Sequence, residues 1–215
     1  MADISSEVRS LLLIRGFSQT GLYPAPINAL HIGNYFADAL APVWGGMALE
    51  KSVLKRAGIP RNRKIQTALD RLVGRGMLVP SGVSYEQTDH GPEMRCSYAL
   101  NEPLTRRFTD TIESDAYWAD VAMFVSEVAL AVSTLGDQVD AGMQLDASYS
   151  DPLLDIDTVV NLDAKQRGAS RTVAVNERIA ALAAETYGRS LEPAELTNLY
   201  LRHLLSLSFA SGSLQ

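Results

Sequence analysis

The strongest constraint on the fold is a change of hydrophobic period between residues 62 and 100. Asn62 stands where a helix N-cap belongs. The apolar residues after it have the spacing of one helix face: Ile65, Ala68, Leu69, Leu72 and Val73. After a polar tip at 89–93 the period becomes two, at Met94, Cys96, Tyr98 and Leu100. This stretch therefore predicts an amphipathic helix followed by a two-stranded hairpin.

The residues before this helix predict a helix-turn-helix. Leu49, Val53 and Ala57 fit one face of a short helix over 49–57, which Gly58 ends and Pro60 prevents from continuing. Helix, four-residue turn, helix and hairpin is the order of a winged helix-turn-helix. Two further helices are expected upstream, one over 5–15 ended by Gly16 and one over 27–40 ended by a proline at 42.

The second half of the chain predicts more helices and an acidic linker. Asn101 is a candidate cap for one helix, and Ser114 or Asp115 for a longer one that reaches Leu135. The apolar surface of the long helix is too wide for one half-buried side, so we expect the C-terminal helices to bury part of it and another protein to meet the rest. The partner-facing candidates are Tyr117, Trp118, Phe124 and Val128.

The predicted fold class is mainly α with a small β-wing: a winged helix-turn-helix plus a C-terminal helical part. Residues 1–107 are assigned to the winged-helix domain with an N-terminal helix extension, and 108–135 to a long apolar linker helix. Residues 136–170 form an acidic linker, because six aspartates follow Asp137 and glycine and proline interrupt any helix. Residues 171–215 form a helical hairpin, in which Gly188 caps the first helix and Pro193 lies in the first turn of the second.

The charge of the chain is strongly segregated. The net charge is −6, but residues 49–107 hold eleven basic and six acidic side chains, while residues 108–164 hold twelve acidic side chains and no Lys or Arg. A basic block of this kind favours contact with nucleic acid, and an acidic block favours docking on a basic protein surface.

Composition indicates a globular chain in a reducing compartment. The most apolar region, 116–135, carries Asp120 and Glu127 and is therefore not expected to span a membrane. The single cysteine, Cys96, cannot form an internal disulfide, which fits the cytoplasm. The N-terminus has no basic leader and no long apolar run, so we expect no secretory signal.

Catalytic motifs are not found in the sequence. It contains no phosphate-binding G-x-x-x-x-G-K-S/T loop, no H-E-x-x-H and no C-x-x-C pair, and we expect no cofactor, no metal and no enzymatic activity. Cys96 falls on the inward side of the alternating strand and is interpreted as a small buried hydrophobe. Four aspartates, Asp151, Asp155, Asp157 and Asp163, lack the order of a calcium loop. A metal-dependent nuclease stays open only if carboxylates cluster in space.

Binding to DNA is better supported. In a winged helix the second helix of the motif enters the major groove, and its N-terminus here reads Arg-Asn-Arg-Lys over 61–64. Asp70 and the acidic hairpin tip argue against sequence-specific recognition, so the alternative is a protein-interaction module whose charges are solvated. The residues expected to face double-stranded DNA are Lys51, Lys55, Arg56, Arg61, Arg63, Lys64, Gln66, Thr67 and Arg71.

Four runs in the first half of the chain resemble a known family. They are LLLIRGFSQTGLYP at 11–24, ADALAPVW at 37–44, LKRAGIP at 54–60 and LDRLVGRGML at 69–78. They resemble the small winged-helix middle components of bacterial three-component systems built around an SMC-like or Rad50-like ABC ATPase, including the Lamassu type of phage and plasmid defence. The resemblance covers residues 10–105, about half of the chain.

The resemblance implies a non-catalytic subunit that docks on the ATPase of an SMC-like dimer. It also implies that this subunit helps to hold an effector, such as a nuclease, until foreign DNA is sensed. The alternative function is a dimeric winged-helix transcription regulator that pairs through helix 115–135. A regulator is expected to purify as a symmetric dimer on a palindromic site, whereas a middle component is expected to co-purify with a large ATPase.

Overall fold

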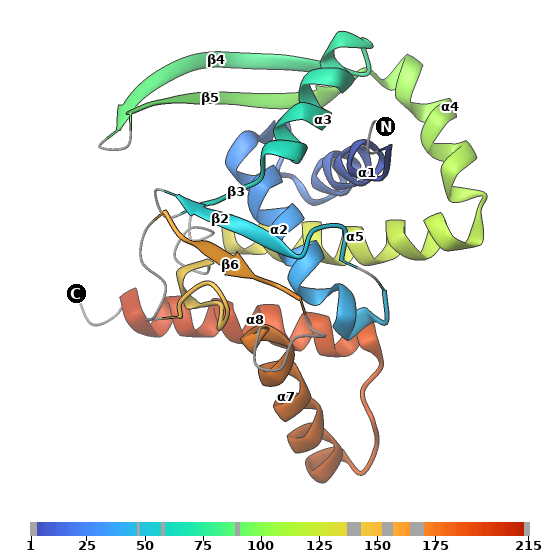
Figure 1. Ribbon diagram of the computed structural model, residues 1–215. Helices are drawn as coiled ribbons and strands as arrows, with labels where there is room; N and C mark the ends of the chain where they lie inside the picture. The colour runs from blue at the N-terminus through green and yellow to red at the C-terminus, as the bar shows by residue number, and fades with distance from the viewer. Residues whose placement is uncertain are drawn as a thin grey trace. The chain divides into compact units, whose positions relative to one another are not determined.

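The computed structural model describes residues 4–46, 48–56, 59–88, 91–136, 143–151, 157–163 and 170–212. The described part is mainly helical with two small antiparallel sheets, as the predicted fold class requires (Figure 1). The chain divides into two compact units, and each is formed by two separate segments. Unit 1 comprises residues 1–34 and 62–133; unit 2 comprises residues 35–61 and 134–215.

Unit 1 contains most of the helices and the longer sheet. Helix α2 starts in unit 1 and passes into unit 2 after Asn34. The elements of unit 1 are α1 (Ile4–Thr20), β1 (Ala25–Pro26), the start of α2 (Ile27–Trp44), α3 (Arg63–Gly74), β4 (Leu78–Thr88), β5 (Gly91–Leu100), α4 (Glu102–Glu113) and α5 (Ala116–Leu135).

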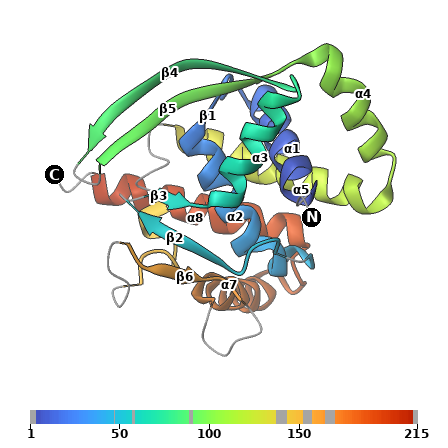
Figure 2. The same ribbon diagram turned by 45° about the horizontal axis from the view of Figure 1, so that its top comes forward.

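The sheet of unit 1 has the order β1-β5-β4, with all strands antiparallel. Ala25 in β1 pairs with Tyr98 in β5, and the β4–β5 ladder contains one irregularity between Ser81 and Ser84. Figure 2 shows the hairpin running well beyond short β1. The predicted hairpin is confirmed, and its period of two is visible in the burial of Cys96, Tyr98 and Leu100.

Helix α1 is the packing centre of unit 1. Its residues from Ser6 to Ile14 are all buried, and Arg9 inside this stretch donates to Asn34 at 2.8 Å. The prediction that Gly16 ends the helix is wrong, because α1 continues to Thr20. A Cβ atom on Gly16 would lie 2.7 Å from the Ala129 side chain, so this glycine permits the close approach of α1 and α5.

Helix α5 is long and apolar enough, by length and composition alone, to cross a membrane. However, Asp120 and Glu127 interrupt its sequence, and one side is occupied by buried residues. The buried residues are Phe124, Val125, Val128, Ala129, Val132 and Leu135. Such a buried stripe is typical of the core helix of a globular protein. The predicted cap is confirmed, since the Asp115 carboxylate accepts from the backbone N–H groups of Tyr117 and Trp118.

Unit 2 combines the rest of α2 with a second small sheet and two helices. Its elements are β2 (Ser52–Arg56), β3 (Ile59–Arg61), β6 (Val159–Asn161), α7 (Arg171–Tyr187) and α8 (Pro193–Gly212). The strand order is β3-β2-β6, and Val53 pairs with Val160. The helix predicted over 49–57 is therefore wrong: residues 49–51 contain no helix, and Ser52–Arg56 form β2, which is stabilised by pairing on both edges. Residues 57–58 lie outside the described part.

A buried carboxylate joins four segments of unit 2. The Asp146 side chain is fully buried and accepts hydrogen bonds from the hydroxyls of Tyr35, Thr172 and Tyr200. The Tyr200 distance is 2.6 Å and the shorter Thr172 distance is 2.9 Å. Backbone N–H groups of Ser148 and Tyr149 also donate to Asp146. Asp146 therefore ties α2, the turn at 146–150, α7 and α8 into one unit.

The predicted domain boundaries differ from the observed units. Residues 35–61 belong to unit 2 rather than to a 1–107 domain, and α4 with most of α5 belongs to unit 1 rather than to a linker. The described residues of the expected acidic linker contribute to the core of unit 2, since Met143, Tyr149, Val160 and Leu162 are buried. Burial of these apolar side chains offsets the acidic composition of the segment.

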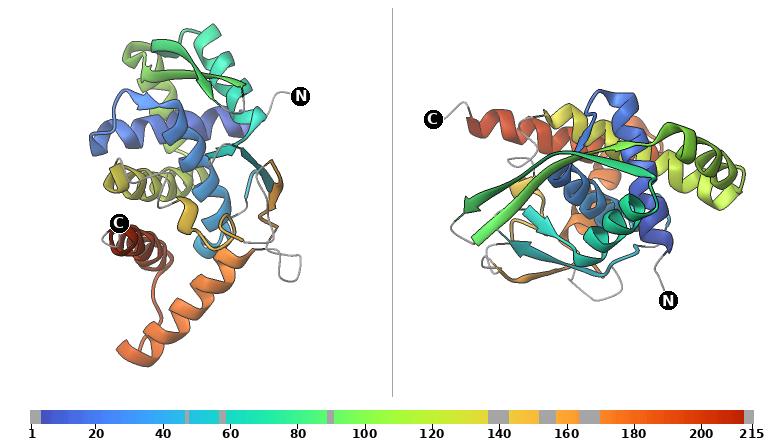
Figure 3. Two further views of the ribbon diagram at one scale, coloured as in Figure 1. Left: turned by 90° about the vertical axis from the view of Figure 1, so that its left-hand side faces the viewer. Right: turned by 90° about the horizontal axis from the view of Figure 1, so that it is seen from above.

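The C-terminal helices α7 and α8 are present where the sequence predicts them. The predicted cap Gly188 is in the left-handed conformation, with φ of 67°, and Pro193 begins α8. The two helices do not form a parallel-sided hairpin: in the left view of Figure 3, α8 is seen nearly end-on while α7 runs lengthwise. Their crossing brings Thr172 of α7 and Tyr200 of α8 to the same carboxylate, Asp146.

Candidate nucleic-acid interface

Helix α3 is formed as its sequence pattern predicts. Ile65, Ala68, Leu69 and Leu72 are buried, and Asn62 accepts from the Lys64 backbone N–H at 2.8 Å. The buried face directs the opposite side of the helix to solvent. The exposed residues are Arg63, Lys64, Thr67, Asp70, Arg71 and Gly74 in α3, followed by its C-cap residue Arg75. The first turn of α3 therefore presents two cations beside the positive end of the helix dipole, a combination that favours anions.

The C-terminal half of the same face is occupied by a carboxylate from α1. Glu7 is buried, with 4% of its side chain exposed, and forms ion pairs with Arg71 at 3.8 Å and with Arg75. The two arginine side chains stay 44% and 54% exposed. Arg71 was expected to contact phosphate; in the structure it is already paired within the chain.

Other polar side chains near α3 are also paired internally. Gln66 is half-buried and donates to Asp70 at 2.9 Å, which turns both side chains along the helix. Thr67 donates to the Arg63 carbonyl oxygen at 2.9 Å. On the hairpin, Arg95 donates to Glu86 at 2.9 Å. The hairpin therefore carries an internally balanced pair, and its tip at 89–90 lies outside the described residues.

The remaining basic candidates belong to unit 2. Lys51 pairs with Asp163 at 3.2 Å. Lys55 donates to the Tyr149 carbonyl oxygen at 2.9 Å, and its ammonium lies 5.0 Å from the centre of the Tyr149 ring. Arg56 is exposed at the end of β2, and Arg61 is half-buried in β3. The basic block of the sequence is thus divided between the two units, with the α3 residues in unit 1 and Lys51, Lys55, Arg56 and Arg61 in unit 2.

The four partner-facing candidates on α5 separate into two pairs. Tyr117 is 55% exposed and Trp118 is half-buried, and their rings meet edge to face with centroids 5.2 Å apart. Phe124 and Val128 are buried, so the chain itself already covers them. The exposed apolar residues on this helix instead include Met123 and Leu130, which the sequence analysis did not select.

Several further features of the described residues bear on binding sites for small molecules or metal ions. Asp146 is fully buried with every approach occupied by a donor, so it is unavailable to a substrate. A shallow, open hollow lies along α4, lined by six residues of that one helix: Glu102, Pro103, Arg106, Arg107, Asp110 and Thr111. Cys96 is buried, as predicted. Within the described ranges, no three His, Cys, Asp or Glu side chains are grouped to hold a metal ion, and Asp155 lies outside those ranges.

Comparison with known proteins yielded no match: no family model, no curated protein and no solved structure resembles the chain significantly. The assignment of a function therefore depends on the residues and geometry of the chain and on the resemblance of its four sequence runs.

Proposed function

We propose that unit 1 is a winged-helix domain and that the chain is a non-catalytic, DNA-binding subunit of an SMC-like ATPase complex that acts against phage or plasmid DNA. The observation that carries the proposal is the order of elements in unit 1. Along the chain α1, β1, α2 and α3 precede the β4–β5 hairpin, and β1 adds to the hairpin at β5. The helix before the hairpin, α3, presents an exposed basic first turn.

In this proposal the helix-turn-helix differs from the one expected from the sequence. The first helix of the motif is α2 rather than 49–57, and β2 and β3 are an insertion between α2 and the recognition helix α3. The insertion is compatible with the fold because its strands pair within unit 2. The residues of α3 that approach the DNA are Arg63, Lys64 and Thr67.

The proposed DNA binding is weak, tolerant of sequence and sensitive to salt. Arg63 and Lys64 are suited to phosphate, whereas Gln66 is engaged with Asp70, which reduces the groups available for reading base edges. Each phosphate contact contributes about 0.9 to the slope of log K against log salt. Two contacts from α3 therefore contribute about 1.8 to that slope.

The ATPase and effector partners are supported by the sequence resemblance of residues 10–105. The effector in such a complex is a nuclease or a comparable toxic subunit, and the assembly operates in the cytoplasm. Tyr117 and Trp118 are the candidate anchors for the ATPase, since large aromatic residues are enriched among residues that dominate binding energy. The acidic residues at 137–163 supply charge that suits a basic partner surface.

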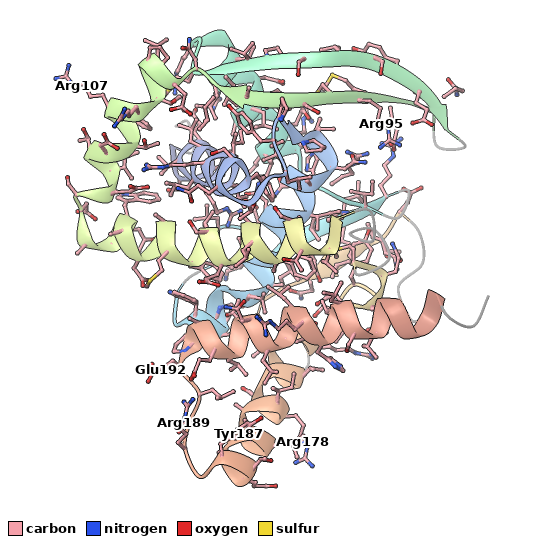
Figure 4. All side chains as sticks on the ribbon, turned by 180° about the vertical axis from the view of Figure 1, so that it is seen from behind. Arg95, Arg107, Arg178, Tyr187, Arg189 and Glu192 are labelled. Carbon is pink, nitrogen blue, oxygen red and sulfur yellow. The ribbon has the colours of Figure 1, made fainter. Side chains whose placement is uncertain are left out.

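The proposed DNA binding is tested with a double variant, Arg63→Ala with Lys64→Ala. We expect the salt slope for a duplex of arbitrary sequence to flatten by about 1.8. The matched control is Arg106→Ala with Arg107→Ala, which removes two exposed cations from α4 of the same unit; Figure 4 shows Arg107 projecting from that helix. Equal effects of the two double variants, or tight binding to a single operator, would contradict the proposed interface.

The proposed assembly is tested by co-purification with an SMC-like ATPase, which is to be sought among the genes that adjoin the gene of this chain. Tyr117→Ala and Trp118→Ala are expected to weaken the complex about thirtyfold each, equivalent to about 2 kcal/mol. Tyr187→Ala on α7 is the control, because this tyrosine is also exposed and is labelled at the end of α7 in Figure 4. A symmetric dimer that protects a palindrome, without ATPase, would instead support the transcription regulator.

A further inference from the structure

The exposed face of α3 carries a stripe of four residues spaced four apart. Arg63, Thr67, Arg71 and Arg75 are all exposed, and residues four apart lie above one another on a helix. Lys64 adds a cation beside the stripe. The stripe is therefore long enough to follow several phosphates of a duplex, and it extends beyond Arg63 and Thr67, which are proposed to approach the DNA.

Glu7 neutralises the second half of this stripe. Its carboxylate pairs with both Arg71 and Arg75, and it projects from α1, which is buried over almost its whole length. Helix α1 is itself fixed by the burial of its residues from Ser6 to Ile14 and by the Thr20–Ser133 hydroxyl pair at 2.6 Å. Because α1 is fixed, Glu7 keeps its position when DNA approaches, and its charge stays beside the two guanidinium groups.

We propose that Glu7 limits the affinity of unit 1 for DNA by acting as an internal counter-ion for Arg71 and Arg75. A backbone phosphate that approaches α3 must share these guanidinium groups with a carboxylate that is already in place. Counterions of DNA are released only to the extent that phosphates are neutralised by protein cations. Glu7 thus reduces both the number of effective phosphate contacts and the salt dependence of binding, which keeps binding weak and reversible.

The inference rests on the proposed DNA-binding function and is tested by Glu7→Gln. This change keeps the shape of the side chain and removes its charge. Two additional effective contacts steepen the salt slope by about 1.8, so the ratio of the association constants at about 50 and about 200 mM salt increases roughly tenfold. An unchanged slope in a variant that folds, by circular dichroism and thermal unfolding, overturns the proposal.

The matched control is Glu113→Gln. It makes the same substitution in unit 1, also removes the partner of an arginine, and does not involve α3. If Glu7 acts only through the net charge of the protein, both variants steepen the slope equally, and the proposal is overturned. If Glu7 acts on Arg71 and Arg75, the gain is specific to Glu7→Gln and disappears when both arginines are also replaced by glutamine.

A second comparison leaves Glu7 in place, and it tests the counter-ion role of Glu7 even if Glu7→Gln does not fold. Arg63→Gln is expected to flatten the slope by about 0.9, whereas Arg71→Gln is expected to leave it nearly unchanged because Glu7 already occupies that arginine. Equal flattening by both single variants overturns the inference. Loss of any effect from Arg63→Gln contradicts the DNA interface itself, so failure of the inference and failure of the proposed function are distinguished.

Discussion

Glu7 in unit 1 and Asp146 in unit 2 are both buried carboxylates that join distant segments, but their partners differ. Glu7 is held by two arginines that stay about half exposed to solvent. Asp146 is held by neutral hydroxyl and amide donors, and the hydroxyl donors Tyr35, Thr172 and Tyr200 are all buried. The first arrangement lies at the surface of its unit and the second lies in a core.

The difference determines what each carboxylate can do. Water can replace Glu7 as the partner of an exposed guanidinium, so the loss of the ion pair is compensated in part. Water cannot reach the donors around Asp146 without opening unit 2, so each donor that loses its acceptor incurs a desolvation cost. We therefore expect the Glu7 cluster to be adjustable by mutation or ligand, and the Asp146 cluster to be essential for folding.

The chain offers a separate probe for each unit. Of its two tryptophans, Trp118 lies in unit 1 and Trp44 lies in unit 2. Trp44→Phe leaves a reporter for unit 1, and Trp118→Phe leaves a reporter for unit 2. Urea unfolding followed by the fluorescence of these two backgrounds measures the effect of any further change on each unit.

The largest effect is expected for Asp146→Ala. It leaves three hydroxyl and two N–H donors of unit 2 without their acceptor, which costs about 5 kcal/mol or more at about 1 to 3 kcal/mol for each unsatisfied group. The Trp44 reporter is expected to show unit 2 unfolded or severely destabilised. The control is Asp151→Ala, which removes a partly exposed ion pair with Arg171. Similar losses from both changes would show that the comparison is wrong.

The next largest effect is expected at alkaline pH. Burial and the neighbouring Asp146 raise the pKa of Tyr35 and the pKa of Tyr200 above their ordinary value of 10. Below pH 10 both tyrosines are protonated in the folded and unfolded states. Above it only the unfolded state loses protons, so unit 2 loses up to about 2.7 kcal/mol of stability per pH unit.

Unit 1 provides the reference for this pH dependence. Burial, followed by the influence of Cys96, also raises the pKa of Tyr98, but this is one tyrosine rather than two. Unfolding of unit 1 is therefore expected to depend about half as steeply on pH between pH 10 and 11. Equal slopes for the Trp44 and Trp118 reporters would contradict the assignment of two linked tyrosines to the Asp146 cluster.

A smaller effect is expected from Glu7→Gln on stability. The amide can still accept a hydrogen bond from one arginine, and both arginines can be hydrated, so the cost to unit 1 is expected to be about 1 to 2 kcal/mol. The Trp118 reporter measures this cost. A loss as large as that of Asp146→Ala would show that Glu7 is as structural as Asp146 and would make it unsuitable as an adjustable counter-ion.

The smallest effect is expected at Glu195, an exposed carboxylate on α8. Hydrogen bonds from Arg189 and from the Glu192 backbone lower its pKa to about 2. Its contribution to stability is present above the ordinary pKa of about 4.5 and is lost as the pH falls towards 2. NMR titration should locate the midpoint, and Arg189→Gln should raise it without a measurable change in urea unfolding. A clear decrease in the free energy of unfolding would mean that exposed ion pairs also stabilise this fold.

The parts of the structure that the sequence predicted depend on neighbouring residues. The amphipathic pattern and the Asn62 cap of α3 lie within twelve residues, and the inward strand residues Cys96 and Tyr98 alternate within a single strand. Helix caps such as Asp115 and Gly188 are likewise local. Patterns of this kind are readable because the determining contacts are close in the chain.

The incorrect and missing predictions concern contacts between distant residues. Leu49, Val53 and Ala57 have helical spacing, but Val53 pairs with Val160 in a strand that lies more than one hundred residues later. Asp146 stands in an acid-rich stretch that reads as solvated, and its donors Tyr35, Thr172 and Tyr200 come from three other segments. The occupation of Arg71 by Glu7 is hidden for the same reason, and it changes which cations are available at the proposed interface.

The division of each unit into two segments has a consequence for protein synthesis. Every segment of unit 1 has been made once residue 133 leaves the ribosome, but β2 must wait for β6, whose residue Val160 follows Val53 by 107 positions. At about 5 to 20 residues per second, this interval lasts on the order of 5 to 20 s. Throughout this interval β2 has an unpaired edge, and for its last part, after residue 133, unit 1 is complete while β2 still lacks β6. Until β6 has been made, residues 35–61 are therefore the segment that a chaperone can bind or that can pair with another chain and aggregate. A fragment that ends at residue 135 lacks β6 and would leave this edge of β2 permanently unpaired.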